Sequence, residues 1–194
     1  MTRNEAFNSL FEQGFDYQFY LSRSDRHEDR MKLSYDETGK LLAEIDQKSL
    51  DTANGTIKVL CIAENWCGDC ANGVPVIARL AEEMDQWDFK IAARDDHEEL
   101  VELYYTTAGR KKIPVIVFAD EDGDEICRWT ERPLRSYQLL KELMEKKLPK
   151  EEYMSEYRKN PELKPPQVTE NILTELLNLA TRAATITAIL PKKR

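Results

Sequence analysis

Residues 63–70 read Ala63-Glu64-Asn65-Trp66-Cys67-Gly68-Asp69-Cys70. A short apolar, β-rich run at 56–63 comes before the cysteines, and from 67 to about 84 the apolar residues recur at helical spacing. Cys67 therefore falls at a strand-to-helix junction, where backbone N–H groups are unpaired and the helix dipole is positive. Both features favour a thiolate, so we expect Cys67 to be a nucleophile with a lowered pKa.

Cys70 lies about one helical turn further on and deeper in the protein. This position suits a resolving thiol, which releases a mixed disulfide by attacking it from within. Trp66 flanks the nucleophile and can shield it, although a purely packing role is the alternative. A zinc site is the main rival, but tetrahedral zinc needs four ligands, usually in two pairs. The other cysteines and the histidines show no paired spacing, so we expect no metal: Cys61, Cys127, His27 and His97.

Composition is that of an ordinary soluble protein with one domain and extensions. The chain has 194 residues, of which 41% are apolar and 33% charged, and its net charge of −8 argues against nucleic-acid binding. No apolar segment follows the polar N-terminus, and no uninterrupted apolar run reaches the roughly 18 residues of a membrane span. The nearest candidate is 183–190. We therefore expect no signal peptide, no membrane contact and a cytoplasmic location.

Apolar periodicity places the remaining elements. It predicts an amphipathic helix over 4–21 that Gly14 interrupts, with aromatic residues that pack on the rest of the protein or, alternatively, face a partner. Short helices are expected within 22–50, and prolines interrupt 149–166. The other predicted elements are strands at 89–93, 114–119 and 125–129 and helices at 98–105, 134–147 and 168–190. Strands alternating with helices, then a hairpin, indicate an α/β fold with a central mixed sheet flanked by helices.

The quoted stretch resembles the active-site segment of the thioredoxin family. Pro75 stands where the family has the proline that kinks the active-site helix, Ile113-Pro114 resembles its cis-proline site, and Asp122-Gly123 matches its hairpin. The resemblance covers about 55–148, and the helical N-terminal extension is similar to that of a bacterial thioredoxin-like subfamily. It implies a helical extension over 1–50, a thioredoxin-like domain over 51–148, and a segment over 149–194 whose C-terminal helix packs on the core.

The resemblance also implies an activity. Cys67 and Cys70 would form the redox-active disulfide of a thiol–disulfide oxidoreductase, with Trp66, Gly68 and Asp69 modulating the pair. Pro114 would be cis, face the cysteines and help to bind an extended substrate backbone. No organic cofactor is implied. The expected substrates are protein or small-molecule disulfides, and a thiol reductase would supply electrons.

Two departures from the family concern the chemistry of the pair. Asp69 replaces the usual proline, and its carboxylate should raise the pKa of Cys67. Cys61 occupies the position of the buried acid that accepts a proton from the resolving cysteine. Glu64 and Arg94 are candidates for that role, and Cys61 is otherwise an apolar strand residue.

Other interpretations remain open. The chain could be a thioredoxin-fold redox-sensing or partner-binding module with little turnover. Its C-terminal helix packs on the core or, alternatively, the terminal helices form a dimer. The basic run 110–112 should lie near the active face, where it is either simply solvated or steers an acidic partner.

Overall fold

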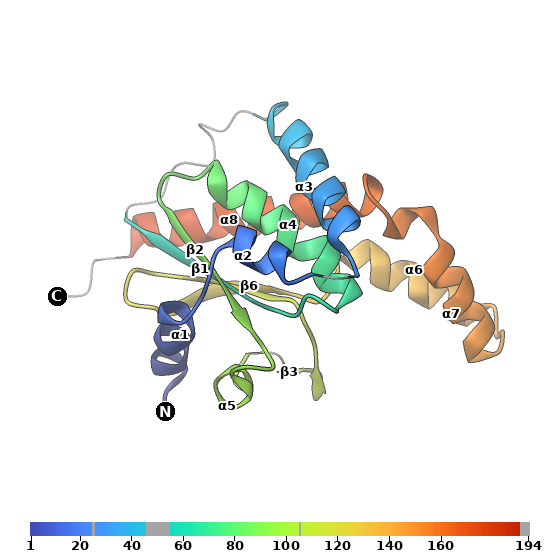
Figure 1. Cartoon of the computed structure of the whole chain (residues 1–194), viewed down its shortest axis with the longest axis horizontal. Helices are drawn as coiled ribbons and strands as arrows, with labels where there is room; N and C mark the ends of the chain where they lie inside the picture. The colour runs from blue at the N-terminus through green and yellow to red at the C-terminus, as the bar shows by residue number, and fades with distance from the viewer. Residues whose placement is uncertain (25, 46–54, 105, 191–194) are drawn as a thin grey trace.

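The computed structural model describes residues 1–24, 26–45, 55–104 and 106–190, and its centre is a four-stranded mixed sheet (Figure 1). The strand order is β2-β1-β5-β6. β1 is parallel to β2, and β5 is antiparallel to both β1 and β6. The strands are β1 (Ile57–Ala63), β2 (Trp87–Ala93), β5 (Val115–Ala119) and β6 (Glu125–Thr130). This sheet confirms the predicted α/β fold.

β1 is the most enclosed part of the sheet. Every residue of it except Lys58 is buried, because strands flank it on both sides and helices cover both faces. Cys61, in the middle of β1, pairs with Ile91 of β2 and Ile116 of β5. The cysteine stretch begins at the end of this strand and is therefore anchored to the rigid centre of the protein.

The helices cover the two faces of the sheet. α4 and α8 lie on one face with α3 packed along α4, and α1 and α5 lie on the other (Figure 1). The helices are α1 (Arg3–Glu12), α2 (Tyr17–Ser22), α3 (Glu28–Leu42), α4 (Gly68–Glu82), α5 (Glu98–Val101), α6 (Leu134–Glu145), α7 (Lys150–Lys159), the 3₁₀ helix η2 (Pro161–Leu163) and α8 (Gln167–Ile189). The extra terminal helices predicted from the sequence are present.

The N-terminal segment packs on the core, which is the first of the two alternatives predicted for its aromatic residues. Phe7 and Phe11 of α1 are buried. The predicted single helix is interrupted at Gly14, which lies between α1 and α2. Phe15 then exchanges two backbone hydrogen bonds of 2.9 Å with Ile91. This single bridge covers part of the free edge of β2, which would otherwise expose unpaired backbone groups.

Two predictions for the helical regions are wrong. In place of several short helices the described part of 22–50 holds the fifteen-residue α3, and 46–50 lie outside the described residues. The helix expected over 98–105 is only the single turn α5.

Two further elements were not predicted. α7 forms inside the proline-interrupted segment because Pro149 and Pro161 stand just beyond its two ends, and Pro149 occupies the N-cap position. The basic run contains β4 (Arg110–Lys111), which pairs with β3 (Thr106–Thr107).

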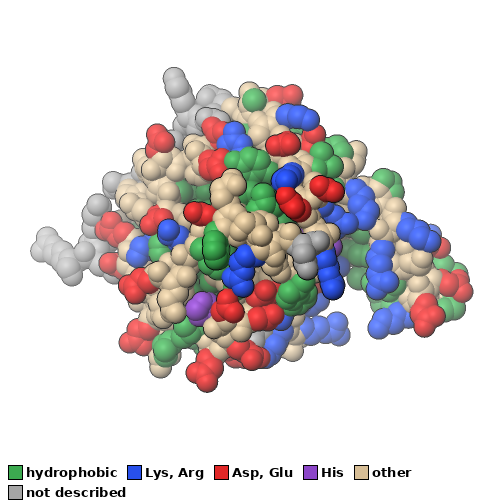
Figure 2. Space-filling view, in the orientation of Figure 1, with side chains coloured by type: hydrophobic (Ala, Val, Ile, Leu, Met, Phe, Trp, Pro, Cys, Tyr) green, Lys and Arg blue, Asp and Glu red, His purple; other side chains and the backbone are tan. Residues whose placement is uncertain are grey.

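α6 and α7 form an arm with a hydrophobic cluster of its own. Leu139 and Leu143 of α6 and Tyr157 of α7 are buried together, apart from the main core. The arm projects from the body of the molecule (Figure 1). Over the visible surface, acidic and basic side chains are interspersed, and Lys and Arg side chains gather where the arm meets the body (Figure 2).

The prediction that no segment is long and apolar enough to span a membrane is wrong for α8. Among the described residues it is the one helix long and apolar enough, by length and composition, to cross a membrane. Counting only uninterrupted apolar runs missed it. Its inner face is buried against α4, β5 and β6, with Leu176 and Ala183 fully enclosed, and a core helix can meet the same criteria.

Candidate active site

The junction between β1 and α4 places Cys67 at the start of a helix. Cys67 is the N-cap residue of α4, with extended backbone angles of φ −85° and ψ 124°, and is partly exposed. Cys70, one turn into the helix, is completely buried. The structure therefore brings the two cysteines together at the helix N-terminus, one accessible and one enclosed.

The two thiols have opposite pKa shifts. The pKa of Cys67 is lowered, first because the Cys70 thiol donates a hydrogen bond to its sulfur and then by the backbone N–H groups of Cys70 and Asp69. Burial and the charge of Asp69 act against this lowering, so the expected effect of Asp69 is present but does not dominate. The pKa of Cys70 is raised, chiefly by burial and also by its hydrogen bond to Cys67.

Pro114 faces the cysteines. The Ile113–Pro114 peptide bond is cis, and the Ile113 carbonyl oxygen lies 3.9 Å from Cys67 Sγ, within reach of a weak S–H hydrogen bond. A Cβ atom on Gly73 of α4 would lie 3.1 Å from Pro114 Cγ and 3.2 Å from Trp129 Cζ3. Gly73 thus allows the proline loop to approach the active-site helix closely, a packing role that sequence reasoning missed.

Cys61 is fully enclosed in the sheet, where burial alone raises its pKa. Tyr20 of α2, which the sequence analysis did not single out, is a nearby polar group. Its hydroxyl is buried and has no hydrogen-bond partner among the described residues. Its pKa is raised by burial first and then by proximity to Cys70. Tyr20 and Glu64 line one small cavity of about 10 Å³.

Trp66 and its neighbours form one side of the site, which we call the tryptophan flank. The Trp66 side chain is 45% exposed, and its Nε1 donates to Asp95 Oδ2 at 3.3 Å. The guanidinium of Arg94 lies 5.0 Å from the centre of the Trp66 ring and pairs with Asp95. Glu64 accepts a hydrogen bond of 2.7 Å from the Asp95 backbone N–H, which ties the flank to β1.

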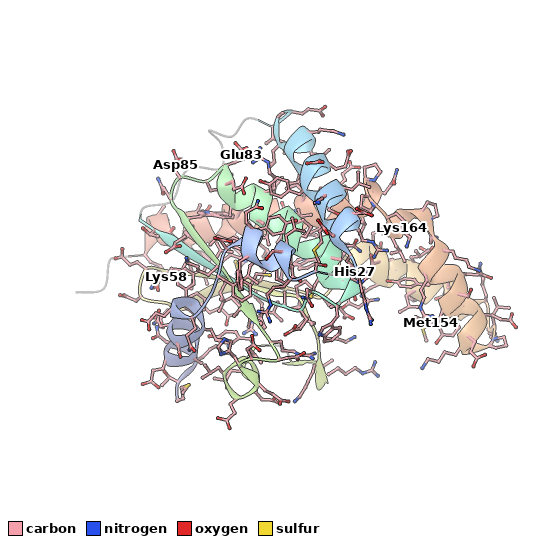
Figure 3. The ribbon with its side chains drawn as sticks, viewed as in Figure 1. His27, Lys58, Glu83, Asp85, Met154 and Lys164 are labelled. Carbon is pink, nitrogen blue, oxygen red and sulfur yellow. The ribbon has the colours of Figure 1, made fainter. Side chains whose placement is uncertain are left out.

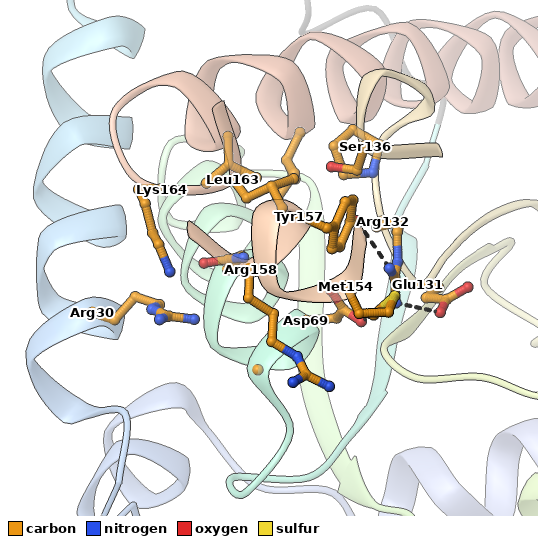
Figure 4. A pocket seen from close by; sticks show the side chains of 15 residues that line it. Arg30, Asp69, Glu131, Arg132, Ser136, Met154, Tyr157, Arg158, Leu163 and Lys164 are labelled. Carbon is orange, nitrogen blue, oxygen red and sulfur yellow. Dashed lines mark hydrogen bonds and ion pairs between the residues drawn. The ribbon is translucent and has the colours of Figure 1, made fainter. Parts of the chain in front are cut away.

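The opposite side, the arginine flank, is a half-buried ionic network. Arg132 Nη2 lies 2.6 Å from Asp69 Oδ2 and 2.6 Å from Glu131 Oε1, and Arg132 Nη1 donates to the Tyr157 hydroxyl at 2.9 Å (Figure 4). Lys112 also pairs with Glu131 at 2.6 Å. The network joins α4 and α7 to the end of β6, and sequence reasoning identified only Asp69 and the basic run.

The basic run 110–112 does not act as one cluster. Lys111 pairs with Glu102 at 3.0 Å on the exposed hairpin, whereas Lys112 belongs to the arginine flank. Cys127 lies elsewhere, with its Sγ donating to the Leu179 carbonyl of α8 at 3.6 Å. Within the described ranges, no group of three or more His, Cys, Asp or Glu side chains could hold a metal ion.

A sequence model of the thioredoxin family matches residues 14–147. The chain belongs to the thioredoxin family. The match includes α2 and α3, so the thioredoxin-family region begins earlier than the stretch around 55 where the sequence resemblance starts. No curated protein matches this thioredoxin-family chain.

Two solved structures show the same fold at low sequence identity, and a third is similar over a shorter part of the chain. A protein of unknown function from Pseudomonas aeruginosa is 17% identical with a TM-score of 0.61, and covers 92% of this chain and 98% of its own. An HIV epitope scaffold is 16% identical with a TM-score of 0.60, and the alignment covers 89% of this chain and 96% of the scaffold. Thioredoxin from Fasciola hepatica is 31% identical over 47% of this chain and 75% of its own, with a TM-score of 0.33.

Proposed function

We propose that this thioredoxin-family protein is a thiol–disulfide oxidoreductase that works through Cys67 and Cys70. The observation that carries the proposal is the asymmetry of the pair. The accessible thiol has the lowered pKa and the enclosed thiol the raised one, as a nucleophile and a resolving group require. The cis Pro114 beside Cys67 offers extended backbone for a substrate chain to lie against.

The reaction transfers two electrons. The Cys67 thiolate attacks one sulfur of a substrate disulfide, which forms a mixed disulfide and expels the other substrate sulfur as a thiolate that takes up a proton. Cys70 then loses its proton and attacks Cys67 Sγ, which releases the second substrate thiol and leaves a Cys67–Cys70 disulfide. An external dithiol reduces that disulfide again, and the reverse sequence oxidises a substrate dithiol.

The proton of Cys70 needs an acceptor, because its pKa is raised and Cys61 cannot serve. Glu64 is our candidate. Burial raises the pKa of its carboxyl group, which makes it a better base than an ordinary glutamate. The backbone N–H of Glu64 donates a hydrogen bond to the Cys70 sulfur, so Glu64 lies close to the thiol whose proton it would accept.

Insulin disulfide reduction tests the proposal with three variants. Cys67→Ser should abolish turnover, and Cys70→Ser should stop it after the first step and trap substrate as a mixed disulfide on Cys67. Cys127→Ser is the matched control, since it removes a thiol hydrogen-bonded to α8 and should leave turnover unchanged. Negligible turnover by the wild type, with partner binding preserved in both serine variants, would instead indicate a redox-sensing or binding module.

The remaining expectations extend this proposal. The substrates would be protein or small-molecule disulfides, the electron donor a thiol reductase, and the location cytoplasmic. Mass spectrometry of the species trapped by Cys70→Ser would identify the partners.

A further inference from the structure

A cavity of about 400 Å³ lies beside the start of the active-site helix (Figure 4). Its walls come from α3, α4, the beginning of α6, α7, the η2 region and α8. Gly68 and Asp69, the two residues that follow Cys67, form part of its lining. The volume is in the range of sites for small molecules, which typically measure several hundred Å³.

Three cationic side chains of this cavity have no acidic partner. Arg30 of α3, Arg158 of α7 and Lys164 after η2 form no ion pair with any described residue. They come from different segments of the cavity lining, and in Figure 4 the ends of Arg30 and Lys164 lie near each other, whereas the exposed Arg158 guanidinium extends away from them. In the wider view Lys164 lies at the edge of the body near the arm (Figure 3). Uncompensated like charges at one site repel each other unless an anion lies between them.

The positions of Arg30 and Lys164 make this arrangement specific. A Cβ atom on Gly68 would lie 3.9 Å from Arg30 Nη1, which places the guanidinium against the first turn of α4. The pKa of Lys164 is lowered, first by burial and then by the charge of Arg30, so the two cations are close enough to affect each other. The positive end of the dipole of the fifteen-residue α4 lies on the same side.

The two acids of the cavity do not compensate these charges. Asp69 and Glu131 are both engaged by Arg132, and Glu131 also by Lys112. Asn72, which is nine-tenths buried, lines the cavity with a side-chain oxygen that has no partner among the described residues. Such an amide is available to a ligand, because it can turn either its oxygen or its NH₂ group inward.

Part of the cavity lining is apolar. Leu163, Val168 and Ile172 line the side formed by η2 and α8. Val168 and Ile172 are already buried, but Leu163 and Met154 are partly exposed. A bare inorganic ion would leave these two side chains without contacts, whereas an organic anion would cover them and gain from the burial.

We propose that this cavity binds a small organic dianion, with its phosphate or carboxylate groups held by Arg30, Arg158 and Lys164 and its carbon skeleton against the apolar part of the lining. Binding rests on the charge and shape of the cavity and not on the oxidoreductase activity. The site is unusual for the chain as a whole, whose net charge is −8.

Titration with phenyl phosphate and phthalate, at constant ionic strength, tests this inference. We expect saturable 1:1 binding of at least one of them by calorimetry, together with amide shifts of Gly68 and Asp69 in NMR spectra. Binding of phenyl phosphate alone would assign the ligand to the phosphate esters, and binding of phthalate alone to the dicarboxylates. Binding of neither, or equal binding of neutral phenol, would overturn the proposal.

Variants separate a built site from general attraction of anions. Arg30→Gln combined with Lys164→Gln should raise the Kd at least about tenfold, and Arg158→Gln alone should raise it less. Lys141→Gln removes an exposed lysine that does not line the cavity and is the matched control. Equal weakening by Lys141→Gln would contradict the proposal. Cys67→Ser should bind as the wild type does, which keeps this test independent of catalysis.

Discussion

The tryptophan flank and the arginine flank hold the same kind of ion pair in different surroundings. Arg94 and Asp95 are 2.5 Å apart, and Arg132 and Asp69 are 2.6 Å apart. The side chains of Arg94 and Asp95 are 27% and 51% exposed, and those of Arg132 and Asp69 are 17% and 31% exposed. Water and salt screen the first pair, while the second lies where charges interact strongly and are costly to leave unpaired.

The comparison teaches that distance alone does not rank these contacts. An exposed pair typically contributes about 0.5 kcal/mol. The arginine flank matters for a different reason. Without Arg132, the Asp69 carboxylate would lose its cation and the Tyr157 hydroxyl would lose a hydrogen-bond donor. We predict that Trp66 of the first flank shields Cys67 sterically, and that Asp69 of the second opposes its thiolate while Arg132 holds α7 through Tyr157.

Arg132→Met should have the largest effect on stability. It leaves Asp69 without its cation, and we expect the free energy of unfolding to fall by about 2 kcal/mol, somewhat less than for a fully buried pair because Asp69 is partly exposed. Urea unfolding measures this change. The matched Arg94→Met should cost under about 1 kcal/mol, and equal losses for the two variants would remove the distinction between the flanks.

Asp69→Asn should lower the pKa of Cys67. The Asp69 charge opposes the thiolate, and without it Arg132 is also freed to act on the site. The rate of iodoacetamide alkylation rises with the thiolate fraction, so its midpoint should move to lower pH. Asp95→Asn, which removes an acid from the other flank, should shift the midpoint less. A midpoint that moved upward in Asp69→Asn would contradict the assignment.

Trp66→Ala should have only a small effect on stability. The ring is half-exposed, and its contacts with Arg94 and Asp95 face water, so the loss should be about 0.5–1 kcal/mol. Its consequence should instead be faster alkylation of Cys67, because a shielding group is gone. Alkylation rates compared at a pH where Cys67 is fully ionised separate shielding from a pKa change. An unchanged rate there would assign Trp66 to packing.

The central part of the fold and the cysteine pair could be predicted because their signals are local. The apolar runs of β1 and β5 and the helical spacing after Cys67 are contained in short windows of sequence. Pro114 required the family resemblance, since nothing in its own neighbourhood specifies a cis peptide bond or contact with Cys67.

The surroundings of the pair could not be predicted, because they are assembled by tertiary packing. Arg132 and Asp69 are 63 residues apart in sequence and meet only when the end of β6 lies beside the start of α4. Tyr20 and Arg30 come from helices α2 and α3, whose sequence shows charge and periodicity but not what they face. α7 is hard to predict because proline usually interrupts a helix, whereas here Pro149 and Pro161 flank α7 and leave its interior free of proline.

The contacts of α1 have a consequence for the order of folding. The side-chain amides of Asn4 and Asn8 donate to the Asp122 carbonyl at 2.9 and 2.8 Å, across separations of 118 and 114 residues. These bonds cannot form until the turn between β5 and β6 exists, and contacts that close such long loops slow folding. We therefore expect α1 to be among the last elements to dock. Pulse-labelling hydrogen exchange should find α1 protected after the sheet.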